Sequence, residues 1–521
     1  MTNQFETHFT SCSCCMSKAC KHSMNAGVSR REFLAGAGMM SSGLALSSLA
    51  TTAFAQGREP EHLSPIRLPL KVQPVLIYNI AQRREGTSWR GWGGIHTEQD
   101  ATEERERITK ELAGMQVLAD FPLEILPLVS VQNPEQAANT AKGDHDVLIM
   151  YAASSWGETL EALVDPKKWT LMFLRHKSGP VYLWYEIVSN RFLRKTVDEF
   201  GQPGVGTKDV VVDKVSELEW RLRSLAALKN TIGKKVICIG GASGWGAGGQ
   251  AAPEHSRNVF HMDLVDVSYD ELGKLIRQAR DNQTLVKRCE EEAKKLIRQD
   301  GVTLDTSEDF VSKALLLTEV FHGLMAEAGT DAITVNHCMG TIMQVSETTA
   351  CMPLSWLNDA NYLAFCESDF VVIPSGVLLH YISGLPVFLN DPTYPHDGVV
   401  TLAHCTAPRK NDGKNLDPVK ILTHFESDWG AAPKVDMQLG RKITVIDPDF
   451  NFKKWCGFEA EIIDNPFLDI CRSQIDVQFD VDTDKLNDET RGFHWMVCYD
   501  NYLKEMEYAV KKLGMEWVDL G

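Results

Sequence analysis

Two carboxylates, Glu367 and Asp391, are the residues of this chain best placed to do chemistry. They lie 24 positions apart in the segment between Cys366 and Cys405. Glu367 stands at the head of a helix-like segment after the apolar run NYLAFC, and Asp391 directly follows the apolar strand LPVFLN. Most isolated acids are solvated surface groups, but acids at the ends of buried elements tend to be paired or metal-bound. Since carboxylate oxygens suit hard cations, the pattern predicts a site on these two residues.

A set of histidines and cysteines in the same half of the chain suggests a zinc site as an alternative. The set comprises His337, Cys338, Cys351, Cys366, His404 and Cys405. No CxxC or HxxxH pair occurs among them, so their spacing gives zinc little support. Buried small thiols are the favoured interpretation. The GxSxG pattern of a serine nucleophile is also absent.

Two glycine- or tryptophan-rich loops follow expected strands. The loop ASGWGAGG (242–249) lacks the Gly-Lys-Ser/Thr of a P-loop and the GxGxxG spacing. It therefore predicts a ligand-facing loop at the carboxyl end of a parallel strand, with plain backbone geometry as the alternative. In the loop 89–96, Arg90 and Trp92 suit sugar binding through ring stacking and charge-assisted hydrogen bonds. Packing of these tryptophans between domains or subunits is the alternative.

Strand-then-helix alternation predicts the elements that must position these residues. The runs PVLIYNI (74–80), HDVLIMYA (145–152), KKVICIGG (234–241) and DAITVNHC (331–338) are typical strands. An amphipathic helix is expected from about 101 to 118, and later runs such as GRKITVIDP indicate short β-strands. We therefore expect an α/β protein with two Rossmann-like parallel-sheet domains, followed by a β-rich α+β C-terminal domain. The expected boundaries are 56–166, 167–345 and 346–521.

Charge narrows the possible partners. The chain has 521 residues and a formal net charge of −17. This charge argues against nucleic acid and anionic membrane surfaces as partners. Neutral sugars, metal cations and other small molecules remain compatible with it.

The N-terminus predicts export. Ser-Arg-Arg-Glu-Phe-Leu (29–34) precedes a weakly apolar run that ends in Ala53-Phe54-Ala55. A twin arginine, a diluted apolar region and a small-residue cleavage site indicate a Tat signal at 1–55, cleaved near Gln56, and a periplasmic or extracytoplasmic location. A membrane anchor is the alternative, but the run has few strongly apolar residues. No other segment has the length and hydrophobicity of a membrane span, so we expect no membrane attachment after cleavage.

Cysteine usage fits this export route. Four of the 13 cysteines precede the twin arginine, and the other nine are scattered without a disulfide-type spacing. Because Tat cargo folds before export, we expect these nine to be reduced and buried.

From about Lys234 to Asp500 the chain resembles the L-fucose isomerase and L-arabinose isomerase group. The resemblance is carried by Cys366-Glu367-Ser368-Asp369, by the apolar segment ending in Asn390-Asp391, and by Gly492-Phe493-His494. In that family a Glu-x-Asp motif, an aspartate 24 residues later and a late histidine hold Mn²⁺. The resemblance therefore implies that Glu367, Asp391 and His494 hold Mn²⁺ or another divalent cation. The Pro-Thr-Tyr-Pro sequence after Asp391, and export itself, depart from the family pattern.

The same resemblance implies an activity. We expect a metal-dependent aldose–ketose isomerase working through an enediolate, with Glu367 and Asp391 as base and acid. Asp369 would orient a ligand or a metal-bound water. Family members are oligomers with shared active sites, so Arg90 and Trp92 would come from a neighbouring subunit of a homo-oligomer. The alternatives are a non-catalytic exported carbohydrate-binding protein and an exported redox enzyme, although no flavin, haem, molybdopterin or iron–sulfur pattern supports the latter.

Overall fold

The computed structural model describes residues 62–155, 157–182, 192–193 and 204–521. The predicted signal peptide lies outside these residues. The described chain divides into two compact units, one of residues 67–229 and the other of residues 62–66 with 230–521. It is a mixed α/β protein with two parallel sheets and a β-rich C-terminal region, which confirms the expected class at this level. No helix among the described residues combines the length and the apolar character needed to cross a membrane.

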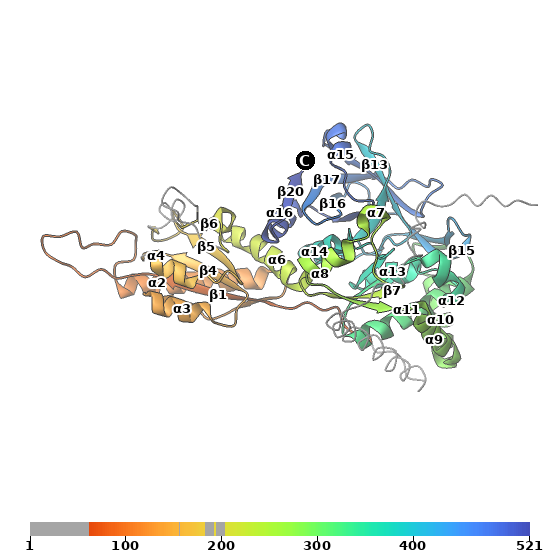
Figure 1. Ribbon diagram of the computed structural model, residues 1–521, viewed down its shortest axis with the longest axis horizontal. Coiled ribbons are helices and arrows are strands. Elements are labelled where there is room, and N and C mark those ends of the chain that lie inside the picture. The colour runs from red at the N-terminus through yellow and green to blue at the C-terminus, as the bar shows by residue number, and fades with distance from the viewer. Residues whose placement is uncertain (1–61, 156, 183–191, 194–203) are drawn as a thin grey trace, which may run out of the picture. The chain divides into compact units, whose positions relative to one another are not determined.

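The unit 67–229 is built on a parallel sheet with strand order β2-β1-β4-β5-β6, and β3 pairs with β1 beyond β2. Its strands are β1 (Leu70–Ile77), β2 (Leu123–Ile125), β3 (Val129–Val131), β4 (Val147–Ala152), β5 (Trp169–Leu174) and β6 (Val210–Val212). Its helices include α2 (Glu98–Leu118), α3 (Pro134–Ala141), α4 (Gly157–Leu163) and α6 (Val215–Thr231) (Figure 1). Every residue of β4 is buried, as expected for a central strand of a parallel sheet covered on both faces.

Local signals explain where these elements begin. Helix α2 starts at Glu98 because Thr97 and Asp100 form a reciprocal capping box. Pro74 was expected at the first position of its strand, but it lies inside β1. The proline is tolerated there because it lies in a gap between two pairings of β1. The pairing with β2 ends at Val72 and the pairing with β3 begins at Val75, so neither β2 nor β3 needs a hydrogen bond from Pro74.

The expected division between residues 166 and 167 falls inside this sheet. Strand β5 pairs in parallel with β4 over five residues, from Val147 with Trp169 to Tyr151 with Phe173. The chain from 167 to 229 therefore completes the first sheet.

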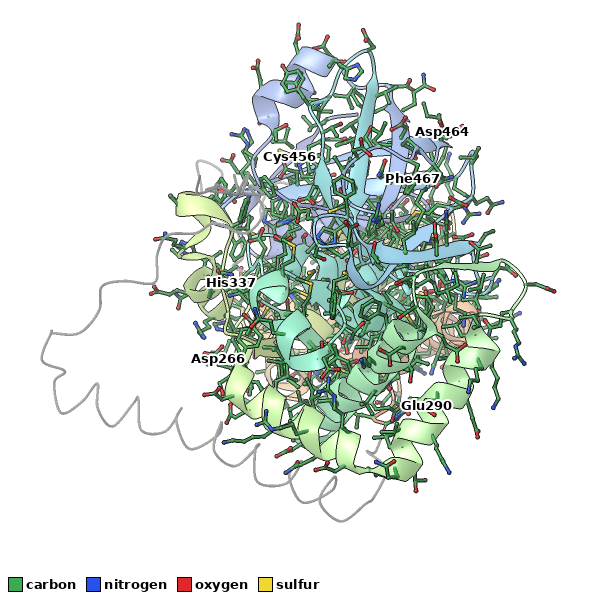
Figure 2. The ribbon with its side chains drawn as sticks, turned by 90° about the vertical axis from the view of Figure 1, so that its right-hand side faces the viewer. Asp266, Glu290, His337, Cys456, Asp464 and Phe467 are labelled. Atoms are coloured by element: carbon green, nitrogen blue, oxygen red, sulfur yellow. The ribbon has the colours of Figure 1, made fainter. Side chains whose placement is uncertain are left out.

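The second unit contains a parallel sheet of order β11-β10-β7-β8. Its strands are β7 (Lys235–Ile239), β8 (Asp263–Val267), β10 (Ala332–Val335) and β11 (Leu363–Cys366). Its helices include α9 (Tyr269–Asp281), α10 (Gln283–Leu296), α11 (Glu308–Ala328), α13 (Cys351–Asp359) and α14 (Ile373–Ser383). One core joins apolar residues of this sheet to those of α9 and α11. Figure 2 shows α10 on the outside of the unit, with its exposed Glu290 labelled.

The C-terminal strands close into a six-stranded barrel, since the path β16-β19-β12-β13-β18-β17 returns through a β16–β17 pairing. These strands are β12 (Phe388–Pro392), β13 (Val399–His404), β16 (Lys442–Pro448), β17 (Lys454–Asp464), β18 (Ser473–Phe479) and β19 (Trp495–Tyr499). Strand β20 (Glu516–Asp519) pairs in parallel with β17. A separate three-stranded sheet is formed by β9 (Val302–Asp305), β14 (Val419–His424) and β15 (Trp429–Val435). The expected boundary at 345/346 precedes β11, which still belongs to the parallel sheet, so the barrel begins only at β12.

Candidate metal centre

The Glu367 turn lies at the carboxyl end of β11, where the parallel sheet meets the barrel within the second unit. Glu367 has a φ of 61° and Ser368 a φ of 48°, so two successive non-glycine residues are left-handed. Such residues are uncommon, and they persist only where surrounding contacts hold them. Here the N–H of Ser243 donates to the Ser368 carbonyl at 3.2 Å, and the N–H of Phe370 donates to the Ser243 carbonyl at 3.0 Å. The turn thereby aims the Glu367 carboxylate at the barrel.

Barrel register brings Asp391 and His494 to the same place. Strands β12 and β19 are antiparallel with Asn390 opposite Trp495, so the neighbouring Asp391 and His494 are opposite one another. His494 Nε2 lies 3.2 Å from Asp391 Oδ1 and 3.4 Å from Glu367 Oε2. The structure thus brings together the three residues predicted as metal ligands. The His494 side chain is fully buried.

Asp369 orients His494 from the side away from the two acids. Its Oδ2 accepts a hydrogen bond from His494 Nδ1 at 2.7 Å, and its Oδ1 accepts from the N–H groups of Trp245 and Val371 at 3.1 and 3.0 Å. Because His494 Nδ1–H donates to Asp369, the proton of neutral His494 stays on Nδ1, and Nε2 presents its lone pair to Glu367 and Asp391. This is the usual arrangement of a carboxylate behind a metal-binding histidine.

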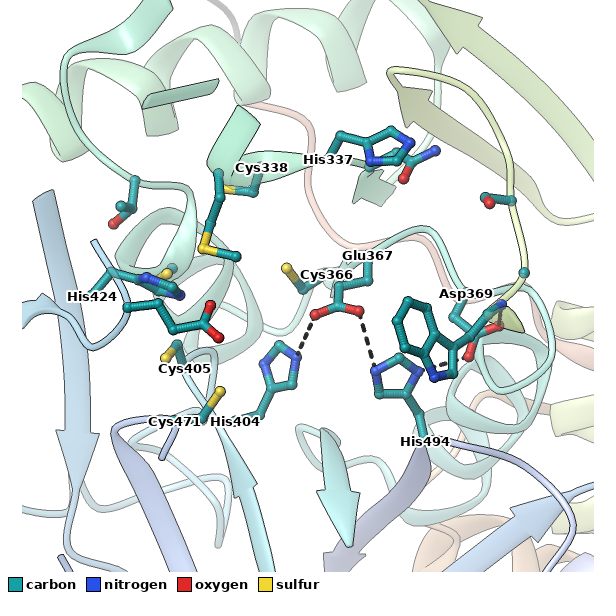
Figure 3. A pocket seen from close by; sticks show the side chains of 18 residues that line it. His337, Cys338, Cys366, Glu367, Asp369, His404, Cys405, His424, Cys471 and His494 are labelled. Atoms are coloured by element: carbon teal, nitrogen blue, oxygen red, sulfur yellow. Dashed lines mark hydrogen bonds and ion pairs between the residues drawn. The ribbon is translucent and has the colours of Figure 1, made fainter. Parts of the chain in front are cut away.

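His404 is a fourth candidate ligand that the sequence reasoning did not place in this set. It ends β13, one residue beyond the Ala403 that pairs with Asp391. Its Nε2 lies 3.7 Å from Glu367 Oε1, and the donor atoms of Glu367, His404 and His494 all lie within 4.8 Å of one another (Figure 3). His404 had been grouped with the cysteines, and no spacing pattern linked it to Glu367.

Glu367 and His494 stabilise each other's charged form. Burial opposes ionisation of Glu367, but the hydrogen bonds and charges of His404 and His494 hold its pKa well below the usual value. Burial likewise disfavours charged His494, but Asp391, Asp369 and Glu367 raise its pKa well above the usual value. Apart from these contacts with one another and with Glu367, three buried atoms have no hydrogen-bond partner: His494 Nε2, His404 Nε2 and Asp391 Oδ1. Buried polar atoms are nearly always hydrogen-bonded. Nitrogen and oxygen atoms that converge on one point without such bonds are the arrangement expected of a cation site.

The glycine-rich loop forms one wall of the pocket over this cluster. Ser243, Gly244 and Trp245 line it together with Glu367 and His494. A Cβ on Gly244 would collide with the backbone of Gly249, so the tight turn needs glycine there. The ring of Trp245 packs 4.6 Å from that of Phe493, centroid to centroid. The loop therefore faces the site, as its position after β7 predicts.

Arg90 and Trp92 belong to the other unit, 67–229. Trp92 is 69% exposed, and the Arg90 guanidinium lies 5.4 Å from the ring centre of Trp89. Their predicted contact with a substrate stays a prediction.

Comparison with known proteins adds no relative: no protein-family model matches the chain, and no curated protein matches it significantly. The resemblance to sugar isomerases therefore remains an expectation from the motifs.

Proposed function

We propose that the protein is a metal-dependent sugar isomerase-like enzyme that interconverts an aldose and a ketose through an enediolate. The observation that carries this proposal is the convergence of Glu367, Asp391, His404 and His494 with unpartnered buried donor atoms. The pocket above them gives a small substrate access to Glu367 and both histidines.

The donor set fits Mn²⁺ or a related divalent cation. Glu367 and Asp391 supply oxygen, and His494 and His404 supply imidazole nitrogen. Carboxylate-rich sites with imidazole suit such cations, whereas structural zinc is held by cysteine and histidine. When bound, a divalent cation would polarise the sugar carbonyl and stabilise the negative charge that develops as the proton leaves.

The carboxylates would move the protons. Aldose-to-ketose conversion takes a proton from C2 and delivers one to C1, while the hydroxyl proton of O2 is transferred to O1, with no net change in oxidation state of the sugar. The lowered pKa of Glu367 keeps its carboxylate ionised, as a cation ligand requires, and Glu367 would act as the base with Asp391 as its acid partner. Asp369 would hold His494 in the required tautomer through its bond to Nδ1.

The wider proposal follows the same resemblance. We propose two Rossmann-like domains before the barrel, a homo-oligomer in which Arg90 and Trp92 of a neighbouring subunit contact a small sugar, and Tat export to the periplasm. Because Mn²⁺ binds weakly in the Irving–Williams order, loading before export would protect the site from copper and zinc.

A non-catalytic carbohydrate-binding protein is the second candidate, favoured by the exposure of Trp92 beside Arg90. Exposed tryptophan stacks on sugar rings without any metal. Such a protein needs neither bound Mn²⁺ nor Glu367.

The deciding experiment measures the metal content of the mature protein after Tat-competent expression, beside Glu367→Gln. In the wild type we expect near-stoichiometric manganese, or a related divalent ion, and this content should fall sharply in Glu367→Gln. The wild type should also interconvert an aldose and a ketose, and Glu367→Gln should not. Glu426→Gln is the matched control, because Glu426 lines the same pocket but belongs to neither cluster of candidate ligands. A folded wild type that binds no divalent metal would refute the isomerase mechanism and favour the carbohydrate binder.

A further inference from the structure

A second cluster of metal-binding side chains lies in the same pocket, and the proposed reaction does not use it. The ligand atoms of Cys351, Cys405 and His424 all lie within 4.8 Å of one another. These residues are only 4%, 3% and 9% exposed. Cys471 packs against Cys351 and Cys405 and lines the same pocket (Figure 3).

Two consecutive residues separate this cluster from the Glu367 site. His404 is the last residue of β13, and Cys405 is the first residue of the turn that follows it. His404 approaches Glu367, whereas Cys405 approaches Cys351 and Cys471. The end of one strand thus contributes an imidazole to one cluster and a thiol to the other.

Backbone and side-chain contacts hold the cluster together. Strand β18 pairs with β13 so that Ser473 lies opposite His404, which brings Arg472 beside Cys405. The Arg472 N–H points at Cys405 Sγ at 3.4 Å, as amides commonly do toward metal-bound thiolates. Its guanidinium donates to the Thr423 carbonyl at 2.7 Å and to Thr423 Oγ1 at 3.3 Å, which fixes the segment carrying His424.

The orientation of His424 also suits a ligand. Ser427 Oγ contacts its Nδ1 at 3.4 Å, which leaves Nε2 to bind a metal. No described cysteine forms a disulfide. A Cys351–Cys405 disulfide would use two thiols and give Cys471 and His424 no role, and simple core packing would not require a histidine among the thiols.

We infer that Cys351, Cys405, Cys471 and His424 form a structural site for a thiophilic divalent cation, with Zn²⁺ as the representative ion. Three thiolates and one imidazole are a common closed zinc set, with no position left for substrate. The ligands come from α13, the end of β13, the end of β14 and the segment before β18, so one ion would tie together four segments around the pocket. Soft sulfur here and hard oxygen at Glu367 would sort two different metals into adjacent sites.

Cobalt substitution tests this inference on the full mature chain. The reduced protein is stripped with a chelator and titrated with Co²⁺, then with Zn²⁺. We expect thiolate-to-cobalt charge-transfer absorption and the intense visible bands of tetrahedral cobalt, both bleached by one equivalent of Zn²⁺. Cys405→Ala should abolish them, whereas Cys498→Ala should retain them, because Cys498 is an equally buried thiol in β19 outside the cluster.

The readout is separable from the isomerase proposal. Glu367→Gln should leave the cobalt–thiolate bands intact even if it abolishes manganese binding. If Cys405→Ala does not fold, Cys471→Ala at the half-buried edge replaces it and should shift or weaken the bands. The inference is wrong if folded wild type shows no such bands, if the cluster variants leave them unchanged, or if mass spectrometry finds a Cys351–Cys405 disulfide in freshly purified mature protein.

Discussion

Two neighbouring residues at the end of β13 belong to clusters that differ in their ligand atoms. His404 belongs to the Glu367 cluster, and Cys405 belongs to the cluster of thiols. Around Glu367, two acids and two imidazoles leave buried donor atoms unpartnered beside an open pocket. Around Cys405, the ligand atoms of Cys351, Cys405 and His424 lie within 4.8 Å of one another, and Cys471 packs against the two cysteines. An oxygen-rich site suits exchangeable substrate and proton transfer, whereas a sulfur-rich set suits a structural ion that cross-links chain segments.

The backbone shows the same contrast. Glu367 and Ser368 have left-handed φ values. In the sulfur cluster, which we define as Cys351, Cys405, His424 and Cys471, no residue has a positive φ. Left-handed non-glycine residues cost on the order of 1–3 kcal/mol each and gather at functional sites. The strained backbone therefore lies on the side of β13 where we propose the reaction.

The largest effect should come from His494→Asn. His494 Nε2 lies within 3.4 Å of both Glu367 and Asp391, so its loss removes the central ligand and leaves buried acids without their partner. We expect manganese affinity to fall by more than about 100-fold, above the range for residues that only orient a ligand. Metal titration of the stripped protein measures this effect.

The matched control for that substitution is His337→Asn, because His337 lines the same pocket without belonging to either cluster. It should keep full manganese affinity. The cobalt–thiolate spectrum should be unchanged in both variants, and loss of both metals in His494→Asn would show that the two clusters are not independent.

Asp369→Asn should have the next largest effect. The amide would present an N–H₂ group to His494 Nδ1 and so favour the tautomer whose Nε2 carries the proton. We expect manganese affinity to fall by about 10–100-fold with the fold preserved. Asp266→Asn is the control, because Asp266 also accepts from the glycine-rich loop, at Ala242 N–H, but lies away from His494. Equal losses in both variants would mean that loop support, and not the tautomer, matters.

The sequence predicted one cluster better than the other for a physical reason. Glu367 and Asp391 are marked by apolar strands beside them, which is a local signal. His404 joins them only through the β12–β13 pairing, and the sulfur cluster is assembled from positions 351, 405, 424 and 471. No short spacing motif can detect ligands brought together by tertiary structure.

Fold prediction met the same limit. Apolar runs identified strands such as β4 and β7, and the parallel class followed from their alternation with helices. The predicted domain boundary at 166/167 differs from the observed division because the sequence of β5, Trp169–Leu174, contains no local signal that this strand pairs with β4. Strand partners, like the ligands from distant segments, are decided by long-range packing.

Arg472→Ala should perturb only the sulfur cluster, and more mildly. It removes two hydrogen bonds to Thr423 but keeps the backbone N–H that points at Cys405. At about 1 kcal/mol for each bond, the two bonds together are worth about 2 kcal/mol, so zinc affinity should fall by up to about 30-fold. Competition between the protein and a chromophoric chelator measures this, with Arg441→Ala, whose partner Asp500 is exposed, as control. A matching loss of manganese affinity would contradict separate roles for the clusters.

The smallest effect, and the sharpest test of the strained turn, is expected from Ser368→Gly. Glycine relieves a left-handed penalty of about 1–2 kcal/mol but loses about 0.5–1 kcal/mol to backbone entropy. It also removes a buried hydroxyl that lacks a hydrogen-bond partner. The urea midpoint of the metal-stripped protein should therefore rise slightly. Asp428→Gly is the control, because Asp428 has a φ of 50° on an exposed turn outside both clusters.

Both glycine variants should stabilise the fold to a similar small extent, since both relieve the same backbone conformation. Only Ser368→Gly should also weaken manganese binding, by about twofold, because a freer turn holds Glu367 less firmly before the cation arrives. Equal manganese affinity in wild type and Ser368→Gly would show that the strain at Glu367 and Ser368 contributes nothing to the site, and would remove the backbone half of the contrast between the clusters.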